Sequence, residues 1–480
     1  MQQHSVSPRK RKLMLYFTYG IMTAAVALIS AFCIFLVLGY RVDLKNGDVE
    51  QGALLQYRSF PAGATINLDG AALSFVTPGK QGIDVGRHTV RYNLAGFEPW
   101  EKTVTVKASE LRWLNYARLV PSDLKTTSLR EFPTVVGQLP SPDRKWIMLQ
   151  AADSKPEFTI ADLRTEDDVK FTTLALPAGT YTAPAAGQTS KFELVEWDFG
   201  ARYVLVKHTI GTTIEYLRVD RTEPAAVVNL SQKLGVTPED IHFSGTSGTV
   251  FYALDDGAIR RLDSGAGTLS QPIVSDVASF RLYKTTSLAY VKKPVDNQVS
   301  VGVVINNKAV RLKSYDASLP VSVDLNEYFN DFYLAVGRGT SVEVYKNPES
   351  DDRSRIATVG SNASISWLRF GNNGRFIVAG TGTQFTTYDI ETDEKFEVNL
   401  PGTPADPAKP LQWLDDYYLV STADNDLRMT EFDGTNQHVL TTSLAGQPVT
   451  LSSTGEYVFS LTRTQGGVYA LQATAMTREQ

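Results

Sequence analysis

The sequence predicts an all-β protein that is attached to a membrane by one N-terminal helix. Three observations lead to this fold class: a long uncharged apolar segment near the N-terminus, short runs of alternating apolar and polar residues, and frequent turn-forming residues between those runs. The chain has 480 residues with 35 Gly and 22 Pro. This mix suits strands that are separated by turns, and the length indicates two or more domains.

The apolar segment covers residues 13–39 and carries no charge before Arg41. Four basic residues come directly before it: Arg9, Lys10, Arg11 and Lys12. A helix of about 27 residues is about 40 Å long and spans a bilayer. A cleaved signal peptide is the alternative, but its apolar region has only about 7–15 residues, and no small-residue cleavage site follows here. We therefore expect a retained signal anchor, with the basic residues in the cytoplasm and everything after Arg41 outside.

Composition excludes several classes of function. A net charge of −5 gives no global reason to expect nucleic acid binding, and the single cysteine, Cys33, rules out an intramolecular disulfide. Nucleophile-elbow, zinc-protease, phosphate-loop and dinucleotide-binding motifs are all missing from the sequence. We expect no catalytic residues, no cofactor and no metal site.

Residues 51–120 alternate with a period of two. Val90 and Tyr92 share one face while Thr89 and Arg91 share the other, and Asp69-Gly70 is a turn signal. Such a pattern predicts half-buried antiparallel strands, so a compact β-sandwich is expected.

This segment resembles the PEGA domain family. The motif residues are Pro61, Gly63, Ala64, Asp69, Gly70, Thr77, Pro78, Gly86, His88, Gly96 and Phe97. The residue after Pro61 is Ala62 where the family usually has an acidic residue. The resemblance implies a small extracytoplasmic β-module of the kind found on bacterial surface proteins. Such a module acts as a binding or spacing unit and has no known catalytic activity. We expect a structural role for His88, because the other histidines are far away in sequence.

Residues 121–480 contain a loose repeat in which a turn leads into an apolar strand and then a polar strand. The clearest copies are "SPDRKWIMLQ", "DFGARYVLVK", "GTSGTVFYAL", "KTTSLAYVKK", "FNDFYLAVGR", "GNNGRFIVAG", "LDDYYLVSTA" and "SSTGEYVFSL". The copies are spaced roughly 40–57 residues apart, and about 40–45 over the last five, and many short strands at such a period indicate a β-propeller. Eight copies predict eight blades, with seven as the alternative. The last blade is one strand short, and residues 124–132 are positioned to supply its outer strand.

Two phrases of this region, "TEFDGTNQHVLTT" and "SPDRKWI", resemble the turns of TolB-type propeller repeats. The predicted organisation is a cytoplasmic tail (1–12), a membrane helix (13–39), a linker (40–50), a PEGA-like sandwich (51–120) and a propeller (121–480).

The expected function is an anchored binding or scaffold protein of the bacterial cell envelope. Its partners would be the lipid bilayer, through residues 13–39, and an envelope protein or cell-wall glycan. The alternative is an envelope enzyme, a glycan hydrolase or lyase on a propeller scaffold. Both readings depend on architecture, which constrains function less than a site does.

Overall fold

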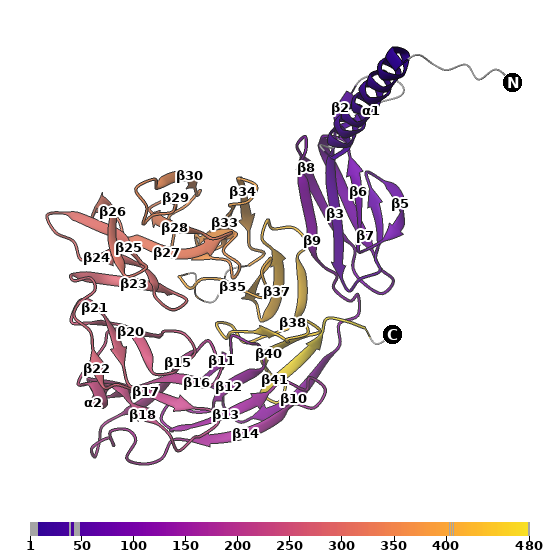
Figure 1. Ribbon diagram of the computed structural model, residues 1–480. Coiled ribbons are helices and arrows are strands. Elements are labelled where there is room, and N and C mark those ends of the chain that lie inside the picture. Colours follow the sequence, from indigo (N-terminus) through magenta and orange to yellow (C-terminus); the bar gives the residue numbers. More distant parts are fainter. Residues whose placement is uncertain are drawn as a thin grey trace. The chain divides into compact units, whose positions relative to one another are not determined.

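The computed structural model describes residues 8–37, 40–42, 49–402, 404, 406 and 408–478 (Figure 1). The chain divides into two compact units, Met1–Asp123 and Leu124–Gln480. Strands make up most of the second unit, whereas the first unit combines strands with one long helix.

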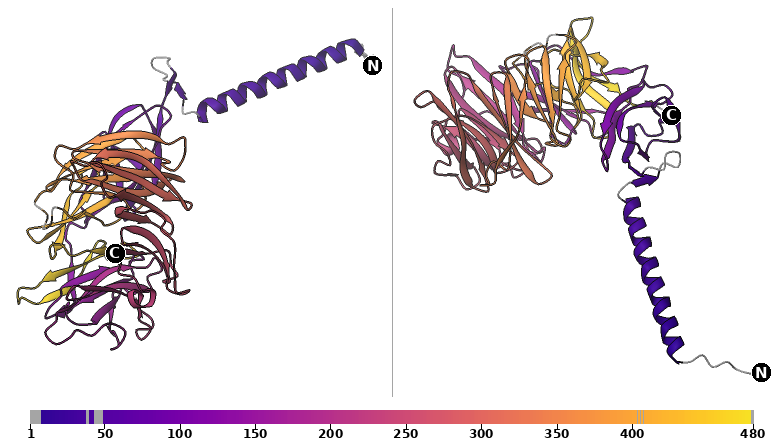
Figure 2. Two further views of the ribbon diagram at one scale, coloured as in Figure 1. Left: turned by 90° about the vertical axis from the view of Figure 1, so that its left-hand side faces the viewer. Right: turned by 90° about the horizontal axis from the view of Figure 1, so that it is seen from above.

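Helix α1 (Pro8–Val37) is one unbroken helix (Figure 2). Its stretch Met14–Ala31 has a mean hydropathy of 1.6 and is not covered by other parts of the protein, so α1 is long and apolar enough to cross a membrane. A helix suits that setting because it satisfies its own backbone hydrogen bonds. Three parts of the predicted segments lie outside the described residues: 1–7 of the tail, 38–39 of the span and 43–48 of the linker. The side chains of residues 9–11 also lie outside the described part of the chain. Lys12 is exposed.

The described residues that follow α1 in the first unit form nine strands. These are β1 (Tyr40–Val42), β2 (Val49–Gln51), β3 (Ala53–Phe60), β4 (Thr65–Leu68), β5 (Ala71–Val76), β6 (Gly79–Ile83), β7 (Gly86–Asn93), β8 (Trp100–Val106) and β9 (Leu111–Arg118). Strands β1 and β2 pair with each other, while two larger sheets have the orders β6-β3-β9 and β5-β4-β7-β8. This arrangement is the predicted sandwich.

Aromatic side chains from both sheets fill the core of the sandwich. Tyr57 of β3 meets Tyr92 of β7 edge-on at 6.4 Å, and Tyr92 stacks on Trp100 of β8 at 4.8 Å. All three are essentially buried, as the period-two pattern predicts. One pairing departs from the predicted antiparallel arrangement, because β3 and β9 run parallel. Trp113 of β9 is 41% exposed, so it lies on the outer face of the sheet.

The described part of the second unit contains eight four-stranded antiparallel sheets, one for each predicted repeat. Blades 1 to 4 consist of β11 (Gly137–Pro140), β12 (Trp146–Gln150), β13 (Glu157–Asp162) and β14 (Lys170–Ala175); β15 (Ser190–Trp197), β16 (Tyr203–Ile210), β17 (Thr213–Asp220) and β18 (Val228–Asn229); β19 (Asp240–Phe243), β20 (Val250–Asp255), β21 (Ala258–Asp263) and β22 (Thr268–Leu269); and β23 (Val277–Tyr283), β24 (Ser287–Lys292), β25 (Gln298–Ile305) and β26 (Lys308–Asp316). The short helix α2 (Leu230–Leu234) follows blade 2.

Blades 5 to 8 continue the ring. They consist of β27 (Val321–Tyr328), β28 (Asp331–Arg338), β29 (Ser341–Lys346) and β30 (Ser354–Gly360); β31 (Trp367–Phe370), β32 (Phe376–Gly380), β33 (Gln384–Asp389) and β34 (Glu394–Asn399); β35 (Gln412–Trp413), β36 (Tyr418–Ala423), β37 (Asp426–Glu431) and β38 (His438–Thr442); and β39 (Thr450–Leu451), β40 (Tyr457–Arg463), β41 (Tyr469–Ala475) and β10 (Thr126–Phe132). The first strand of each blade lies toward the middle of the ring and the last toward its periphery (Figure 1). The unit is an eight-bladed β-propeller.

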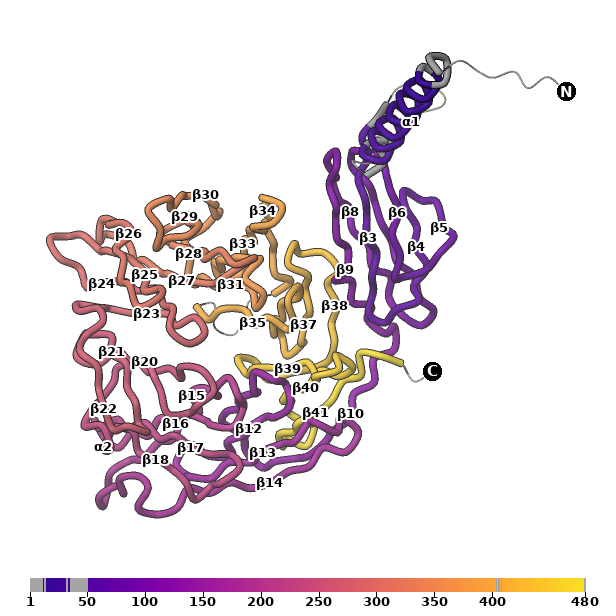
Figure 3. Tube along the Cα trace, in the orientation of Figure 1, coloured from indigo at the N-terminus to yellow at the C-terminus, as the bar shows by residue number. Residues whose placement is uncertain are grey.

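The two ends of this unit meet in blade 8. Strand β10, from the start of the unit, pairs antiparallel with β41 from its end, from Thr126 opposite Thr474 to Phe132 opposite Tyr469. Figure 3 shows the two segments side by side. This pairing confirms the predicted closing strand and leaves no open edge where the ring begins and ends.

The hydrophobic core of the propeller lies between neighbouring blades. One cluster joins Met148 and Phe158 of blade 1 to Val204 and Val206 of blade 2. Other clusters join blades 2 and 3, 3 and 4, 4 and 5, 5 and 6, and 8 and 1. Because each blade buries both faces against its neighbours, its second strand reads as a continuous apolar run rather than an alternating one.

Candidate functional site

Charged side chains gather on the first strands of blades 2 to 6. This inner-strand charge cluster consists of Glu196, Asp240, His242, Arg281, Asp324 and Arg369. His242 is its best-defined member: its Nδ1 lies 2.8 Å from Glu196 Oε2 and its Nε2 lies 3.3 Å from Asp240 Oδ2. Burial lowers the pKa of His242, but hydrogen bonds to Asp240 and Glu196 outweigh burial and raise this pKa to about 10.

Two carboxylates of this cluster also satisfy backbone groups of the next blade. Glu196 Oε1 accepts a hydrogen bond from Phe243 N at 2.5 Å, and Asp324 Oδ2 accepts one from Phe370 N at 2.8 Å. These donors lie on the strand edge that no neighbouring strand covers, where an unpaired N–H group is costly. The cluster therefore ties successive blades together.

The same geometry limits what the cluster can do chemically. The protonated imidazole of His242 donates from both nitrogens and holds no free lone pair, so it is not a general base. Within the described part of the chain, no group of three or more His, Cys, Asp or Glu side chains is arranged to hold a metal ion. The ion pairs that define this cluster are those of His242 with Glu196 and Asp240.

Exposed aromatic side chains lie on one face of the propeller. All blades have the same strand order, so the turns between their first and second strands lie on one side of the ring, which we call the first-turn face. Phe329 of blade 5 and Phe199 of blade 2 lie in such turns and are 77% and 50% exposed. Phe329 has a φ of 47° and the next residue, Asn330, has a φ of 66°. A bulky side chain in this left-handed region costs about 1–3 kcal/mol.

Phe329 rests on a rigid support. Its ring meets that of Tyr328 at 4.6 Å, and the Tyr328 hydroxyl donates to Glu391 at 2.9 Å. Glu391 is paired with the buried Arg375, which also binds Asp389 Oδ2 at 2.6 Å. This chain of contacts runs from blade 5 into blade 6 and holds the exposed phenyl ring in place from below.

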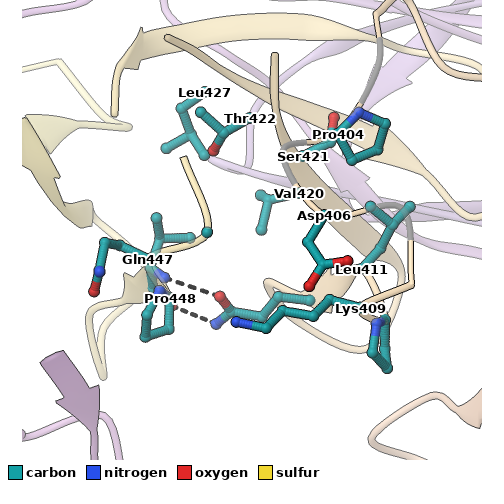
Figure 4. A pocket seen from close by; sticks show the side chains of 14 residues that line it. Pro404, Asp406, Lys409, Leu411, Val420, Ser421, Thr422, Leu427, Gln447 and Pro448 are labelled. Carbon is teal, nitrogen blue, oxygen red and sulfur yellow. Dashed lines mark hydrogen bonds between the residues drawn. The ribbon is translucent and has the colours of Figure 1, made fainter. Parts of the chain in front are cut away.

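A pocket of about 250 Å³ lies between the connections that enter blades 7 and 8. Figure 4 shows Asp406, Lys409 and Leu411 along one wall and Gln447 and Pro448 along the other. The pocket is smaller than a typical small-molecule site, which has a volume of roughly 300–1,000 Å³.

The predicted motif residues of the first unit form three clusters at strand ends. In the first, Thr77 Oγ1 lies 2.6 Å from Ser59 Oγ and accepts a hydrogen bond from Ala64 N at 3.0 Å. Gly63 N donates to Thr77 O at 2.8 Å. Pro61 and Pro78, which flank this cluster, each follow a cis peptide bond. The cluster closes the loop between β3 and β4 onto the end of β5.

The second cluster joins Asp69 to His88. Asp69 and Gly70, with φ values of 50° and 84°, form the two-residue turn between β4 and β5. The Asp69 carboxylate accepts from Thr89 N at 2.8 Å and lies 2.7 Å from His88 Nδ1, while His88 Nε2 lies 2.9 Å from Asp84 O. The hydrogen bonds from Thr89 N and His88 hold the pKa of Asp69 below its usual value. Gly86 begins the strand that carries His88, at a φ of 138°.

The third cluster fastens the end of the first unit. Phe97 forms an isolated antiparallel bridge with Pro121, and Ser122 N donates to Gly96 O at 3.0 Å. Gly96 has a φ of 82°, which most side chains disfavour. The motif residues are thus distributed over three fastening points and do not converge on one opening.

Residues 54–121 match the PEGA domain family. The chain carries a PEGA domain. No curated protein sequence matches the chain significantly. The family match therefore identifies one domain and covers only a small part of the chain.

Solved structures similar to this chain are propellers of low sequence identity. An oligogalacturonate lyase in complex with manganese is 11% identical, with 62% of this chain and 96% of that chain covered and a TM-score of 0.39. The Dos1 propeller is 11% identical, covers 74% and 95%, and has a TM-score of 0.47. An oligogalacturonate lyase from Vibrio parahaemolyticus is 11% identical, covers 74% and 99%, and has a TM-score of 0.39. The assignment of the propeller itself depends on its eight sheets.

Sequence reasoning missed the inner-strand charge cluster and the exposed Phe329. His242 and Glu196 are 46 residues apart and meet only because their strands belong to adjacent blades. The signal for Phe329 was present, because a Phe-Asn pair stands where a two-residue turn between strands usually has Asn-Gly.

Proposed function

We propose that this protein is an envelope-anchored binding protein whose propeller recognises a protein partner through its first-turn face. Helix α1 anchors it, its N-terminal end stays in the cytoplasm, and the PEGA domain and propeller lie outside the membrane. The basic residues in the first turns of α1, directly before its apolar stretch, and the PEGA match support this topology.

The observation that carries the proposal is Phe329. Its ring is 77% exposed in a strained turn, and solvent exposure of a large apolar group gives no stability in return. Interfaces are enriched in aromatic residues, and rigid anchors lose little entropy on binding. The support from Tyr328 and Glu391 supplies such rigidity.

The partner that fits this surface combines an apolar pocket with polar groups. Ion pairs border the turn of Phe329, including Lys284 with Glu327 at 3.1 Å and the Arg375 network. Exposed apolar anchors surrounded by charged groups are typical of protein interfaces with a polar rim. Phe199 would provide a second anchor on the same face.

Photo-crosslinking in native membranes tests the proposal. Phe329 is replaced by p-benzoylphenylalanine, which keeps an aromatic ring, and Val295 is replaced in the same way as the matched control. Val295 is 64% exposed but lies in a turn between second and third strands, on the opposite face. We expect a discrete adduct from position 329 that the Phe199→Ala substitution weakens. Equal adducts from both positions, or none from position 329, would overturn the proposal.

A further inference from the structure

Three polar side chains form a hydrogen-bonded row across blade 2. Ser190 Oγ lies 2.7 Å from His208 Nε2, and His208 Nδ1 lies 2.7 Å from Glu215 Oε1. They come from three adjacent strands, β15, β16 and β17, and His208 lies directly opposite Glu215. Hydroxyl, imidazole and carboxylate in this order, with these two nitrogens, are the arrangement that activates a serine nucleophile.

The imidazole is held rigidly. His208 is fully buried and stacks on Phe192 at 4.1 Å and 3°, with Tyr181 edge-on at 5.4 Å. Such fixed orientation is what a general base requires, since its nitrogen must stay aimed at the hydroxyl proton.

Glu215 fixes which nitrogen of His208 carries the proton. Its carboxylate is buried and also accepts hydrogen bonds from Thr182 N at 2.8 Å and Asn229 Nδ2 at 2.7 Å. Burial raises the pKa of Glu215, but the hydrogen bonds from His208, Asn229 and Thr182 outweigh it, so the net pKa is lowered and the group is ionised. Nδ1 of a neutral His208 therefore donates to Glu215, and its Nε2 lone pair faces the Ser190 hydroxyl.

Ser190 is the accessible end of the row. It is half-buried, whereas His208 and Glu215 are buried, and it follows directly on the exposed residues 183–189. Phe192 N donates to Asp153 O of blade 1 at 2.6 Å, so the N–H groups of residues 190 and 192 point away from β16. The Ser190 N–H group thus lies on the edge of β15 that is turned away from β16.

We propose that Ser190, His208 and Glu215 form a site that hydrolyses acyl esters. Ser190 Oγ bonds to the acyl carbon while its proton passes to His208 Nε2; the ester C–O bond breaks, and the alcohol leaves with that proton. Water then attacks the acyl-serine, giving one proton through His208 back to Ser190 Oγ and releasing the carboxylic acid. Water is the only co-reactant, and the activity is independent of the binding face proposed above.

Covalent labelling of the full-length protein tests this proposal. The purified protein is treated with diisopropyl fluorophosphate, and the modified residue is located by peptide mass spectrometry. We expect one adduct, on Ser190, at least about 100-fold faster than on Ser244, in line with the large losses when a triad member is removed. Ser244 is the matched control, because it is also half-buried but donates its hydroxyl to Thr285 O.

Hydrolysis of p-nitrophenyl acetate provides the second readout. The Ser190→Ala substitution should lower the rate to that of the uncatalysed reaction, whereas Ser244→Ala should leave it unchanged. Labelling of the wild-type protein needs no variant to fold, so it decides on its own. Absence of an adduct on Ser190, at a reagent concentration that labels a serine protease completely, would overturn the proposal and show that the row only braces blade 2.

Discussion

Replacing Phe132 by alanine should weaken the closure of the propeller ring. Phe132 is the last residue of β10 and is 7% exposed, packed among side chains from blade 8, such as Phe459 and Leu471, and from blade 1, such as Ile147. It is therefore a buried apolar contact made by the closing strand at the seam between the two ends of the ring. Loss of a buried phenylalanine side chain costs about 3–5 kcal/mol.

The expected change in melting temperature follows from the size of the unit. An unfolding entropy of about 2.1 cal/mol/K per residue gives about 0.75 kcal/mol/K for roughly 350 residues, so Phe132→Ala should lower Tm by about 4–7 °C. Hydrogen exchange should also speed up in β41, the pairing partner of β10. The control is Thr127→Ala, at an exposed position of the same strand.

The reasoning would be refuted by equal stability of the Phe132→Ala and Thr127→Ala proteins. Unchanged exchange protection in β41 would also refute it, because it would show that β10 does not close the ring.

Three further predictions concern polar contacts. Thr77→Val should destabilise the PEGA domain by about 1–3 kcal/mol, measured by chemical unfolding, because it removes the acceptor of the buried Ala64 N–H group. Burial lowers the pKa of His88, but Asp69 and a backbone carbonyl outweigh it and raise the pKa above 6.5; Asp69→Asn should lower the pKa seen by NMR titration. Glu196→Gln should lower the pKa of His242 from about 10, because the amide can still accept a backbone hydrogen bond but no longer carries the charge.

The two histidines also predict how stability depends on pH. Both have pKa values that folding raises, so their contribution is complete below about pH 6.5 and is lost as the pH rises through the folded value. Asp69 has a lowered pKa, so its contribution is present above about pH 4 and is lost as the pH falls through its folded value. If substitution of either histidine left the loss of stability at alkaline pH unchanged, this account would be contradicted. The prediction for Thr77 would be contradicted if Thr77→Val destabilised the protein no more than Thr103→Val, at an exposed position, does.

The sequence was most informative where a local pattern repeats. The repeat copy "GNNGRFIVAG" predicted the second strand of blade 6, because a turn signal leads directly into its apolar run. The closing strand could be predicted because the last blade lacked one. The parallel pairing of β3 and β9 could not, since alternation reports which face is buried but not which strand lies alongside.

Functional side chains were harder to predict because they converge across blades. Glu196 and His242 belong to different repeats, and nothing in one repeat identifies its partner in the next. The pairing of His208 with Glu215 is different: the two-residue turn at Gly211 and Thr212 fixes the register of their hairpin and places them opposite each other. That register was accessible from the sequence.

The most direct test of the central claim is the rate of cysteine labelling in intact cells with a membrane-impermeant maleimide. The only native cysteine, Cys33, lies in α1, so single reporters can be introduced as Thr286→Cys on the first-turn face and Val295→Cys on the opposite face. We predict that both cysteines react without lysis of the cells. The cysteine at position 286 should react at least about tenfold more slowly in cells than in purified protein, whereas the cysteine at position 295 should not. Adding Phe329→Ala should remove that protection. Labelling that requires lysis, or equal rates at position 286 in cells and in purified protein, would contradict the account.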